Sequence, residues 1–166
     1  MTSGSYYRDR LISTAQSDDY QERASAGPQL AAFAGDIVVD SALVQLLLDV
    51  EDSDVTSETV QALLARRDEV GMRLVAEALA SDESKRHWLD FSLGVVLKST
   101  DESSWIEAVC RSLTGDQDEV VRRGARELLD RLAAPDFGSA ADKDHPVGGT
   151  PEGVSTWLIE PWEPGI

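Results

Sequence analysis

The side chains that most often do chemistry are few in this sequence and lie far apart. There are two histidines, His87 and His145, and one cysteine, Cys110. Metal sites need several histidine, cysteine or carboxylate ligands that converge on one point. Glu83 and Asp90 share one helical face with His87, but this set is more typical of a solvated, charged helix surface. We therefore expect no metal ligand and no cofactor.

Nucleophilic catalysis is not indicated either. Cys110 lies in an apolar stripe between Val109 and Leu113, which is typical of a buried structural thiol rather than a reactive thiolate. The glycine pair at 148–149 lacks the strand–helix context and the Lys-Ser/Thr of a phosphate-binding loop. The G-x-S-x-G nucleophile motif does not occur in the sequence. These patterns predict no catalytic residue and favour a protein that is not an enzyme.

The charge of the chain restricts its partners. The 166 residues include 15 Lys+Arg and 31 Asp+Glu, which gives a formal net charge of −16. This charge repels the phosphates of nucleic acids and of anionic membranes, so we expect neither as a partner. Five carboxylates fall within residues 49–58. They are typical of helix caps on a solvated surface, or alternatively of a surface that binds a basic protein.

Length and cysteine content indicate the class of protein. A chain of this length predicts one domain, or one domain with a tail, and needs no disulfide for stability. One cysteine cannot form an intrachain disulfide, which favours a reducing compartment, so we expect a cytoplasmic protein. The first ten residues lack an apolar signal core, and no apolar run approaches the ~20 residues that span a bilayer. No particular oligomeric state is predicted.

Helical periodicity dominates most of the chain. Apolar residues recur at spacings of three and four, as in Leu43, Leu46 and Leu47. Such patterns predict eight helices, at about 5–16, 18–33, 38–49, 53–66, 69–80, 82–98, 102–114 and 117–133. Pro28 falls inside the second of them, and we expect it to kink this helix or to end it near Ala26. The predicted fold class is all-α.

The helices carry a repeat whose aspartate anchors are 33, 30 and 36 residues apart. The anchors are Asp19, Asp52, Asp82 and Asp118. Four residues later come Arg23, Thr56, Arg86 and Arg122. Seven residues after the anchors come Ala26, Thr59, Leu89 and Ala125, and eleven residues after them come Leu30, Leu63, Leu93 and Leu129. Offsets of four, seven and eleven fall on one helical face, so this face should turn toward a partner helix.

The best copy of the repeat resembles the second helix of a HEAT-like repeat, of the short bacterial kind found in phycobilisome lyase-type proteins. The residues that carry the resemblance are Asp118, Val121, Arg122, Ala125 and Leu129. It implies an α-α superhelix over residues 1–133, a HEAT- or armadillo-like solenoid of about four helical hairpins. Tetratricopeptide repeats have a similar period, but their Trp, Gly and Tyr landmarks are missing here. Stacked hairpins bury the apolar stripes that one hairpin leaves exposed, and the second helices should line the inner face.

Residues 134–166 differ from the rest and predict an irregular C-terminal tail. Five of the six prolines and five of the twelve glycines lie there, so we expect the helices to stop near Ala133. The large apolar residues of this segment are Trp157, Leu158, Ile159 and Trp162. Such residues gain free energy from burial, so we expect the tail to dock through Trp157 and Trp162. It would cap the end of helix 117–133, lie in the groove, or bind a partner.

We therefore predict a non-catalytic protein-binding scaffold or adaptor that binds another protein in its inner groove. Trp88 would be the desolvated aromatic anchor of this site. The polar rim around it would comprise Glu58, His87, Asp90, Arg123 and Arg126. One alternative is an acidic inhibitor or immunity protein that neutralises a basic toxin or nuclease. A second is a lyase-like repeat enzyme or small-molecule carrier, which would need a closed pocket.

Overall fold

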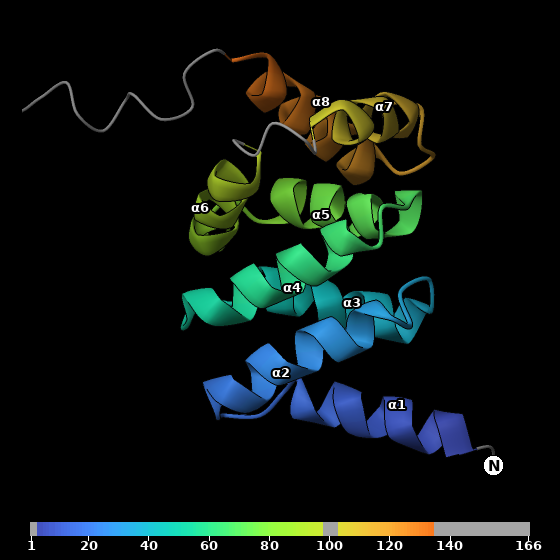
Figure 1. Ribbon diagram of the computed structural model, residues 1–166, viewed down its shortest axis with the longest axis vertical. Helices are drawn as coiled ribbons and strands as arrows, with labels where there is room; N and C mark the ends of the chain where they lie inside the picture. Colours follow the sequence, from blue (N-terminus) through green and yellow to red (C-terminus); the bar gives the residue numbers. More distant parts are fainter. Residues whose placement is uncertain (1–2, 98–102, 135–166) are drawn as a thin grey trace, which may run out of the picture.

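The computed structural model describes residues 3–97 and 103–134, and within them all regular secondary structure is helical. The helices are α1 (Ser3–Thr14), α2 (Tyr20–Ala31), α3 (Ile37–Leu47), α4 (Ser53–Ala65), α5 (Glu69–Ser81), α6 (His87–Val96), α7 (Ser103–Leu113) and α8 (Glu119–Ala133) (Figure 1). The predicted all-α class is confirmed. His145 and the expected docking of Trp157 and Trp162 lie outside the described residues.

Aspartates begin five of the helices. The capping residues are Asp19, Asp36, Asp52, Asp68 and Asp118. Each carboxylate accepts a hydrogen bond from a backbone N–H in the first turn, at 2.8–3.0 Å. Such a cap satisfies a donor that the helix itself leaves without an acceptor and stabilises by about 1 kcal/mol. Part of the large acidic excess therefore positions helix starts.

The sixth helix begins later than the periodicity predicts. We expected a helix from residue 82, but α6 begins at His87. The Asp82 carboxylate accepts from both the backbone N–H and the hydroxyl of Ser84, which stabilises a turn in place of a first helical turn. Arg86 occupies the cap position of α6, and within the described residues no side chain caps this helix.

The expected break at Pro28 does not occur. Helix α2 continues through Pro28 to Ala31. Proline removes one backbone hydrogen bond, but Ala26 and Leu30 are buried on either side of it and hold both halves of the helix against the core. The proline ring itself is on the exposed side of α2. Tertiary packing therefore overrides the local preference, and the prediction that α2 ends near Ala26 is wrong.

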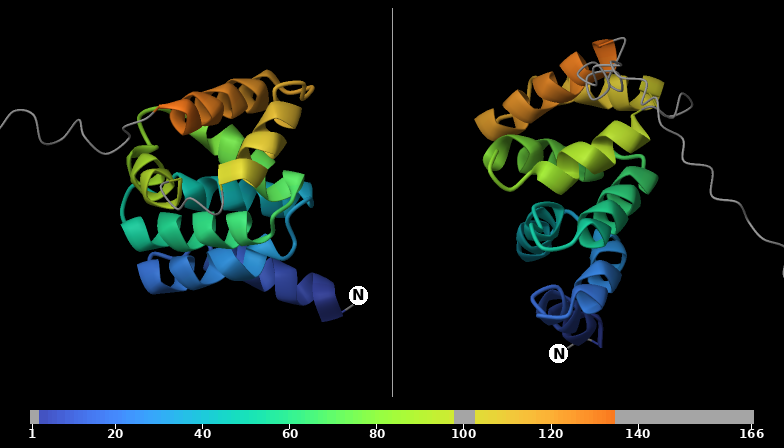
Figure 2. Two further views of the ribbon diagram at one scale, coloured as in Figure 1. Left: turned by 45° about the horizontal axis from the view of Figure 1, so that its top comes forward. Right: turned by 90° about the vertical axis from the view of Figure 1, so that its left-hand side faces the viewer.

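The helices follow one another in chain order along the longest axis of the molecule (Figures 1 and 2). Helix α4 packs against α2 on one side and α6 on the other, and α3 packs against α4 and α5. Helix α8 packs against α5 and α7. One continuous cluster of buried side chains, from Leu11 in α1 to Leu128 in α8, connects these layers.

Two glycines allow the closest helix contacts. A Cβ atom at Gly124 of α8 would lie 1.9 Å from the carbonyl oxygen of Ala76 in α5. At Gly27 of α2, a Cβ atom would lie 2.2 Å from Oγ1 of Thr59 in α4. Real Cβ atoms do not approach other atoms this closely, so both contacts require glycine.

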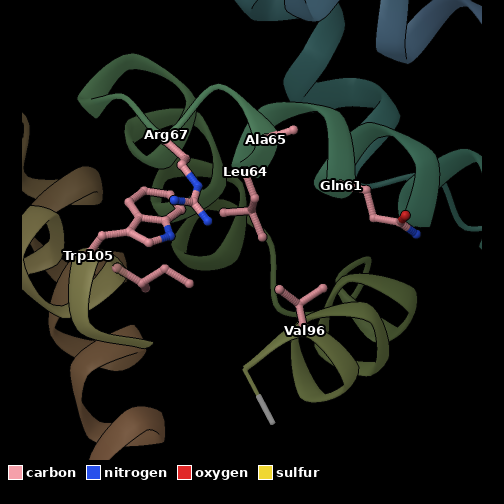
Figure 3. Close-up of a pocket in the computed structure, with 7 residues that line it drawn as sticks. Gln61, Leu64, Ala65, Arg67, Val96 and Trp105 are labelled. Carbon is pink, nitrogen blue, oxygen red and sulfur yellow. The ribbon is translucent and has the colours of Figure 1, made fainter. Parts of the chain in front are cut away.

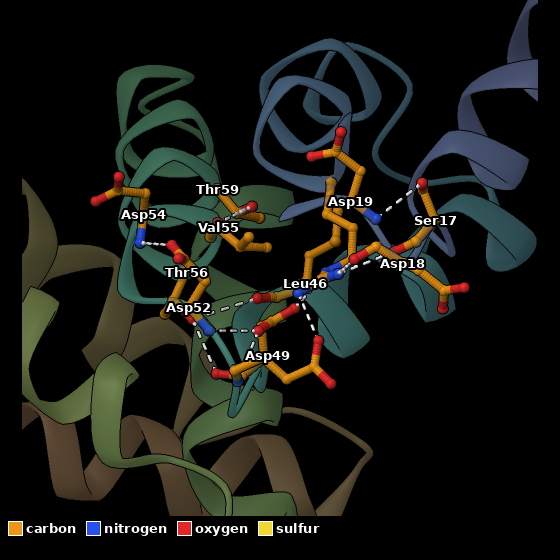
Figure 4. Close-up of polar contacts among 12 residues, drawn as sticks. Ser17, Asp18, Asp19, Leu46, Asp49, Asp52, Asp54, Val55, Thr56 and Thr59 are labelled. Carbon is orange, nitrogen blue, oxygen red and sulfur yellow. Dashed lines mark hydrogen bonds and ion pairs between the residues drawn. The ribbon is translucent and has the colours of Figure 1, made fainter. Parts of the chain in front are cut away.

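The four side chains that follow the repeat anchors by four residues all donate to backbone carbonyls upstream. Arg23 is buried and donates to the carbonyls of Ser17 and Asp18 at 2.9 and 3.1 Å. Arg122 donates at the same two offsets, to the carbonyls of Asp116 and Gln117, at 2.6 and 2.9 Å. Arg86 donates to the carbonyl of Leu79 at 3.0 Å, and the Thr56 hydroxyl makes long bonds to the carbonyls of Leu46 and Asp49 (Figure 4). Each of these side chains thus joins the start of one helix to the end of the helix before it, or to the turn between them.

Candidate protein-binding surface

Helix α6 exposes an apolar surface. Trp88, Phe91 and Val95 are three and four residues apart, so they lie on one side of the helix. Phe91 and Val95 are each 60% exposed, whereas Trp88 is half-buried. The rings of Trp88 and Phe91 meet edge to face with centroids 6.5 Å apart, and the His87 ring lies 4.7 Å from that of Trp88. We call these four residues the aromatic face of α6.

The opposite side of α6 fixes it to α4. Leu89 and Leu93 are buried in the core. The hydroxyls of Ser57 in α4 and Ser92 in α6 are 2.8 Å apart. This hydroxyl contact and the packing of α6 on α4 hold the two helices side by side.

The exposed side of α4 is acidic and borders a hollow. Asp54 and Glu58 are exposed and four residues apart on α4. Together with α2 they line a shallow hollow of about 560 Å³, whose walls include Tyr20, Ala24 and Pro28. We call this the acidic hollow. Glu58 therefore belongs to an acidic surface that α2 and α4 form together.

Asp90 ties α6 to α8. Its carboxylate accepts a hydrogen bond from Arg131 at 2.6 Å and lies 3.4 Å from Nε of Arg86. Arg131 also pairs with Glu127 at 2.6 Å, and its side chain is only 10% exposed. The Asp90 carboxylate is thus bound within the molecule, to arginines on the side of α6 that faces α8.

The structure places the two predicted arginines on α8, away from the aromatic face of α6. Arg123 donates to the backbone carbonyl of Ala80 at the end of α5. Arg126 is exposed and lies 3.9 Å from Glu119. These residues precede Arg131, the contact to α6, by eight and five positions, or roughly 12 and 8 Å along the helix axis. Of the predicted site residues, the structure brings together His87 and Trp88, whose ring centroids are 4.7 Å apart. Glu58 lies on α4, the Asp90 carboxylate pairs with Arg131, and Arg123 and Arg126 lie on α8.

A second concavity lies where α4, α6 and α7 meet. This cleft of about 410 Å³ is lined by Leu64, Val96, Ile106, Trp105 and Arg67, with Gln61 and Ala65 at its edge (Figure 3). The Arg67 side chain extends toward the indole of Trp105 (Figure 3). Arg67 adopts a φ of 53°, which is uncommon for a residue with a side chain. No pattern in the sequence predicts this cleft, since its residues come from three helices and from the turn after α4.

The single cysteine, Cys110, is buried. Burial raises the pKa of the Cys110 thiol to about 12, so the thiol is protonated at neutral pH. Among the residues that the structure describes, no three His, Cys, Asp or Glu side chains are placed to hold a metal ion. None of the described helices combines the length and apolar character needed to cross a bilayer.

The residues that sequence reasoning missed are Phe91 and Val95. Both follow the same three-and-four spacing as core residues, so the pattern alone does not mark them as exposed. Because the repeat predicts that Leu89 and Leu93 are buried, the position of Phe91 and Val95 on the opposite side of the helix was the signal that they are exposed. Comparison of the chain with known protein families, with curated proteins and with solved structures finds no match.

Proposed function

We propose that this protein is a non-catalytic scaffold that binds another protein across the exposed sides of α2, α4 and α6. The observation that carries the proposal is the aromatic face of α6, where Phe91 and Val95 are each 60% exposed. Exposed aromatic and aliphatic side chains grouped on one helix, beside polar residues, are typical of protein-binding sites. Trp88 is the anchor of this site, with His87 and Glu58 at its rim.

We further propose that the framework is a short HEAT-like array of four helical hairpins. The similar donation of Arg23, Arg86 and Arg122 to upstream carbonyls supports this assignment. The positions seven residues after the repeat anchors support it as well. These positions are Ala26, Thr59, Leu89 and Ala125, and all four are fully buried. In such an array α2, α4 and α6 are neighbouring second helices, which accounts for their shared exposed surface.

The chemistry of the surface suggests the partner. A segment that carries apolar side chains could bury Phe91 and Val95, and basic side chains could pair with Asp54 and Glu58 in the acidic hollow. The formal net charge of −16 would accelerate the approach of a basic partner. The partner we propose is therefore a protein with a basic and partly apolar surface.

The second candidate function is an acidic inhibitor of a basic protein, and the acidic hollow favours it. The two functions differ in which part of the surface provides the affinity. Binding through the aromatic face of α6 should survive 0.5 M salt. Binding that depends on carboxylates should weaken steeply as salt increases, because screening shortens the range of charge interactions.

The test is affinity capture with matched variants of the full chain. A specific partner should bind the natural chain but bind Phe91→Ala/Val95→Ala or Trp88→Ala much less. The control, Ile37→Ala/Val38→Ala, removes two apolar residues that are 84% and 56% exposed on α3 and should capture the partner normally. Circular dichroism should show the same helicity for all variants. Equal capture by the α6 variants, with helicity intact, would contradict the proposal.

A further inference from the structure

We propose that residues 155–162 of this same chain bind the aromatic face of α6 and cover it when no partner is present. This inference rests on the proposed function. It adds that the C-terminal segment and a partner compete for the same surface of α6. The occupant and the site can nevertheless be tested without knowing the partner.

The composition of this segment fits an apolar surface. Its sequence is STWLIEPW, in which Trp157, Leu158, Ile159 and Trp162 are large and apolar. The aromatic face of α6 offers Phe91 and Val95, both largely exposed. Contact between the two removes apolar area from water on both sides, at about 25 cal/mol per Å². Aromatic pairs across such a contact add to this through edge-to-face packing.

The chain is close to α6 where its described part ends. Helix α8 contacts α6 through Arg131 and Asp90, whose atoms are 2.6 Å apart. The described part of the chain ends three residues later, at Ala134. Twenty residues separate Ala134 from Ser155. Fully extended they reach roughly 66 Å, whereas the ten residues of α6 are only about 15 Å long. The connecting residues are therefore long enough for the contact. Because segment and site belong to one chain, the effective concentration of the segment at α6 is in the millimolar range.

Charge selects the aromatic face of α6 over the acidic hollow. The segment and its flank carry Glu160 and Glu163. Asp54 and Glu58 in the acidic hollow would repel these carboxylates. The aromatic face of α6 is apolar, and His87 is its titratable member. The segment should therefore compete with a partner at α6 but leave the acidic hollow open.

The experiment measures binding of a fluorescent peptide, residues 153–166, to full-length chains by fluorescence anisotropy. In Trp157→Ala/Trp162→Ala the internal segment is disabled, so the peptide should bind this chain about tenfold more tightly than it binds the natural chain. Adding Phe91→Ala/Val95→Ala to that variant should abolish binding. Adding Ile37→Ala/Val38→Ala instead should leave binding unchanged, and a peptide with both tryptophans replaced by alanine should not bind.

Hydrogen exchange of the backbone amides of α6 provides the intramolecular readout. These amides should exchange faster in Trp157→Ala/Trp162→Ala than in the natural chain, while those of α3 stay unchanged. Equal peptide affinity for the two chains, absence of binding, or loss of binding with the α3 substitutions would each overturn the inference. If the peptide binds as expected but no partner is captured, the proposed function fails and the inference stands. If a partner is captured through α6 but the peptide does not bind, the inference fails and the proposed function stands.

Discussion

Helices α6 and α8 each follow a turn that contains a repeat anchor, yet they are held in different ways. Helix α8 starts from the Asp118 cap and approaches α5 so closely that only glycine fits at position 124. Helix α6 has no side-chain cap among the described residues and buries only Leu89, Ser92 and Leu93. Its Phe91 and Val95 face solvent.

Helix α8 thus belongs to the packed framework, whereas α6 presents apolar side chains to solvent. Side chains on α8 that pack against α5 could not be exposed without separating two backbones in contact. The apolar side chains of α6 are exposed already, so a partner can cover them without any rearrangement of the core. Exposed apolar side chains are a liability in solution, and their grouping on one helix is explained if something covers them.

The largest expected effect comes from adding one carbon to α8. Gly124→Ala should lower the free energy of unfolding by about 2–3 kcal/mol, because its Cβ would overlap the carbonyl of Ala76. Chemical denaturation measures this loss. The control is Gly4→Ala in α1, where nothing lies within 4 Å of the added atom and the change should stay within about 0.5 kcal/mol. Equal effects of the two substitutions would mean that α8 is not held by close packing.

The next effect tests the link between the two helices. Arg131→Met should cost about 1–2 kcal/mol, because it removes the more buried of the two guanidinium groups that Asp90 and Glu127 share, and leaves them only Arg86. Arg126→Met, on the exposed side of α8, should cost less than about 0.5 kcal/mol. Both are read from denaturation midpoints. In addition, Arg131→Met should increase hydrogen exchange in α6 more than in α5; a uniform increase would contradict a role for Arg131 in fixing α6.

The turn before α8 should contribute a stability that depends on pH, through the carboxylate of Asp116. The backbone N–H of Asp118, and after it the guanidinium of Arg73, lower the pKa of Asp116 below its ordinary value of 3.8. The stability that this carboxylate provides is present above the ordinary pKa and is lost as the pH falls through the lowered one. Asp116→Asn should therefore cost about 1 kcal/mol at pH 7, and the cost should shrink below about pH 4. Thermal unfolding of both chains from pH 7 to pH 3 tests this, and a cost independent of pH would contradict it.

The smallest expected effect on stability is on the aromatic face of α6. Phe91→Ala/Val95→Ala should change the free energy of unfolding by no more than about 0.5 kcal/mol, since both side chains are mostly in water. Denaturation of the natural and substituted chains would show it. A loss above about 2 kcal/mol would mean that these residues belong to the core, and the contrast between α6 and α8 would disappear.

Periodicity and capping residues predicted the helices well because both are local. The patterns around Leu43 and Leu74 place helices that the structure contains, and the aspartates before them define most starts. The start of α6 was misplaced because the carboxylate of Asp82 can cap a turn as readily as a helix. Pro28 was misjudged because the burial of Ala26 and Leu30 is a tertiary effect.

The site was predictable only in part. His87 and Glu58 are exposed and Trp88 is half-buried, on two helices that pack against each other. The repeat offsets of seven and eleven predicted that Leu89 and Leu93 would be covered, but they did not indicate that Phe91 and Val95 would form an exposed apolar surface. The role of Asp90 depends on Arg131, which is 41 residues away in sequence.

Pro28 has a consequence for recognition in the acidic hollow. A proline has no amide hydrogen, so the carbonyl oxygen of Ala24, four residues earlier, is not used by the helix ladder at this step. Ala24 and Pro28 both form the wall that faces Asp54 and Glu58. At position 28 the wall that α2 contributes to the hollow thus presents an apolar ring and no N–H donor to anything that approaches the two carboxylates.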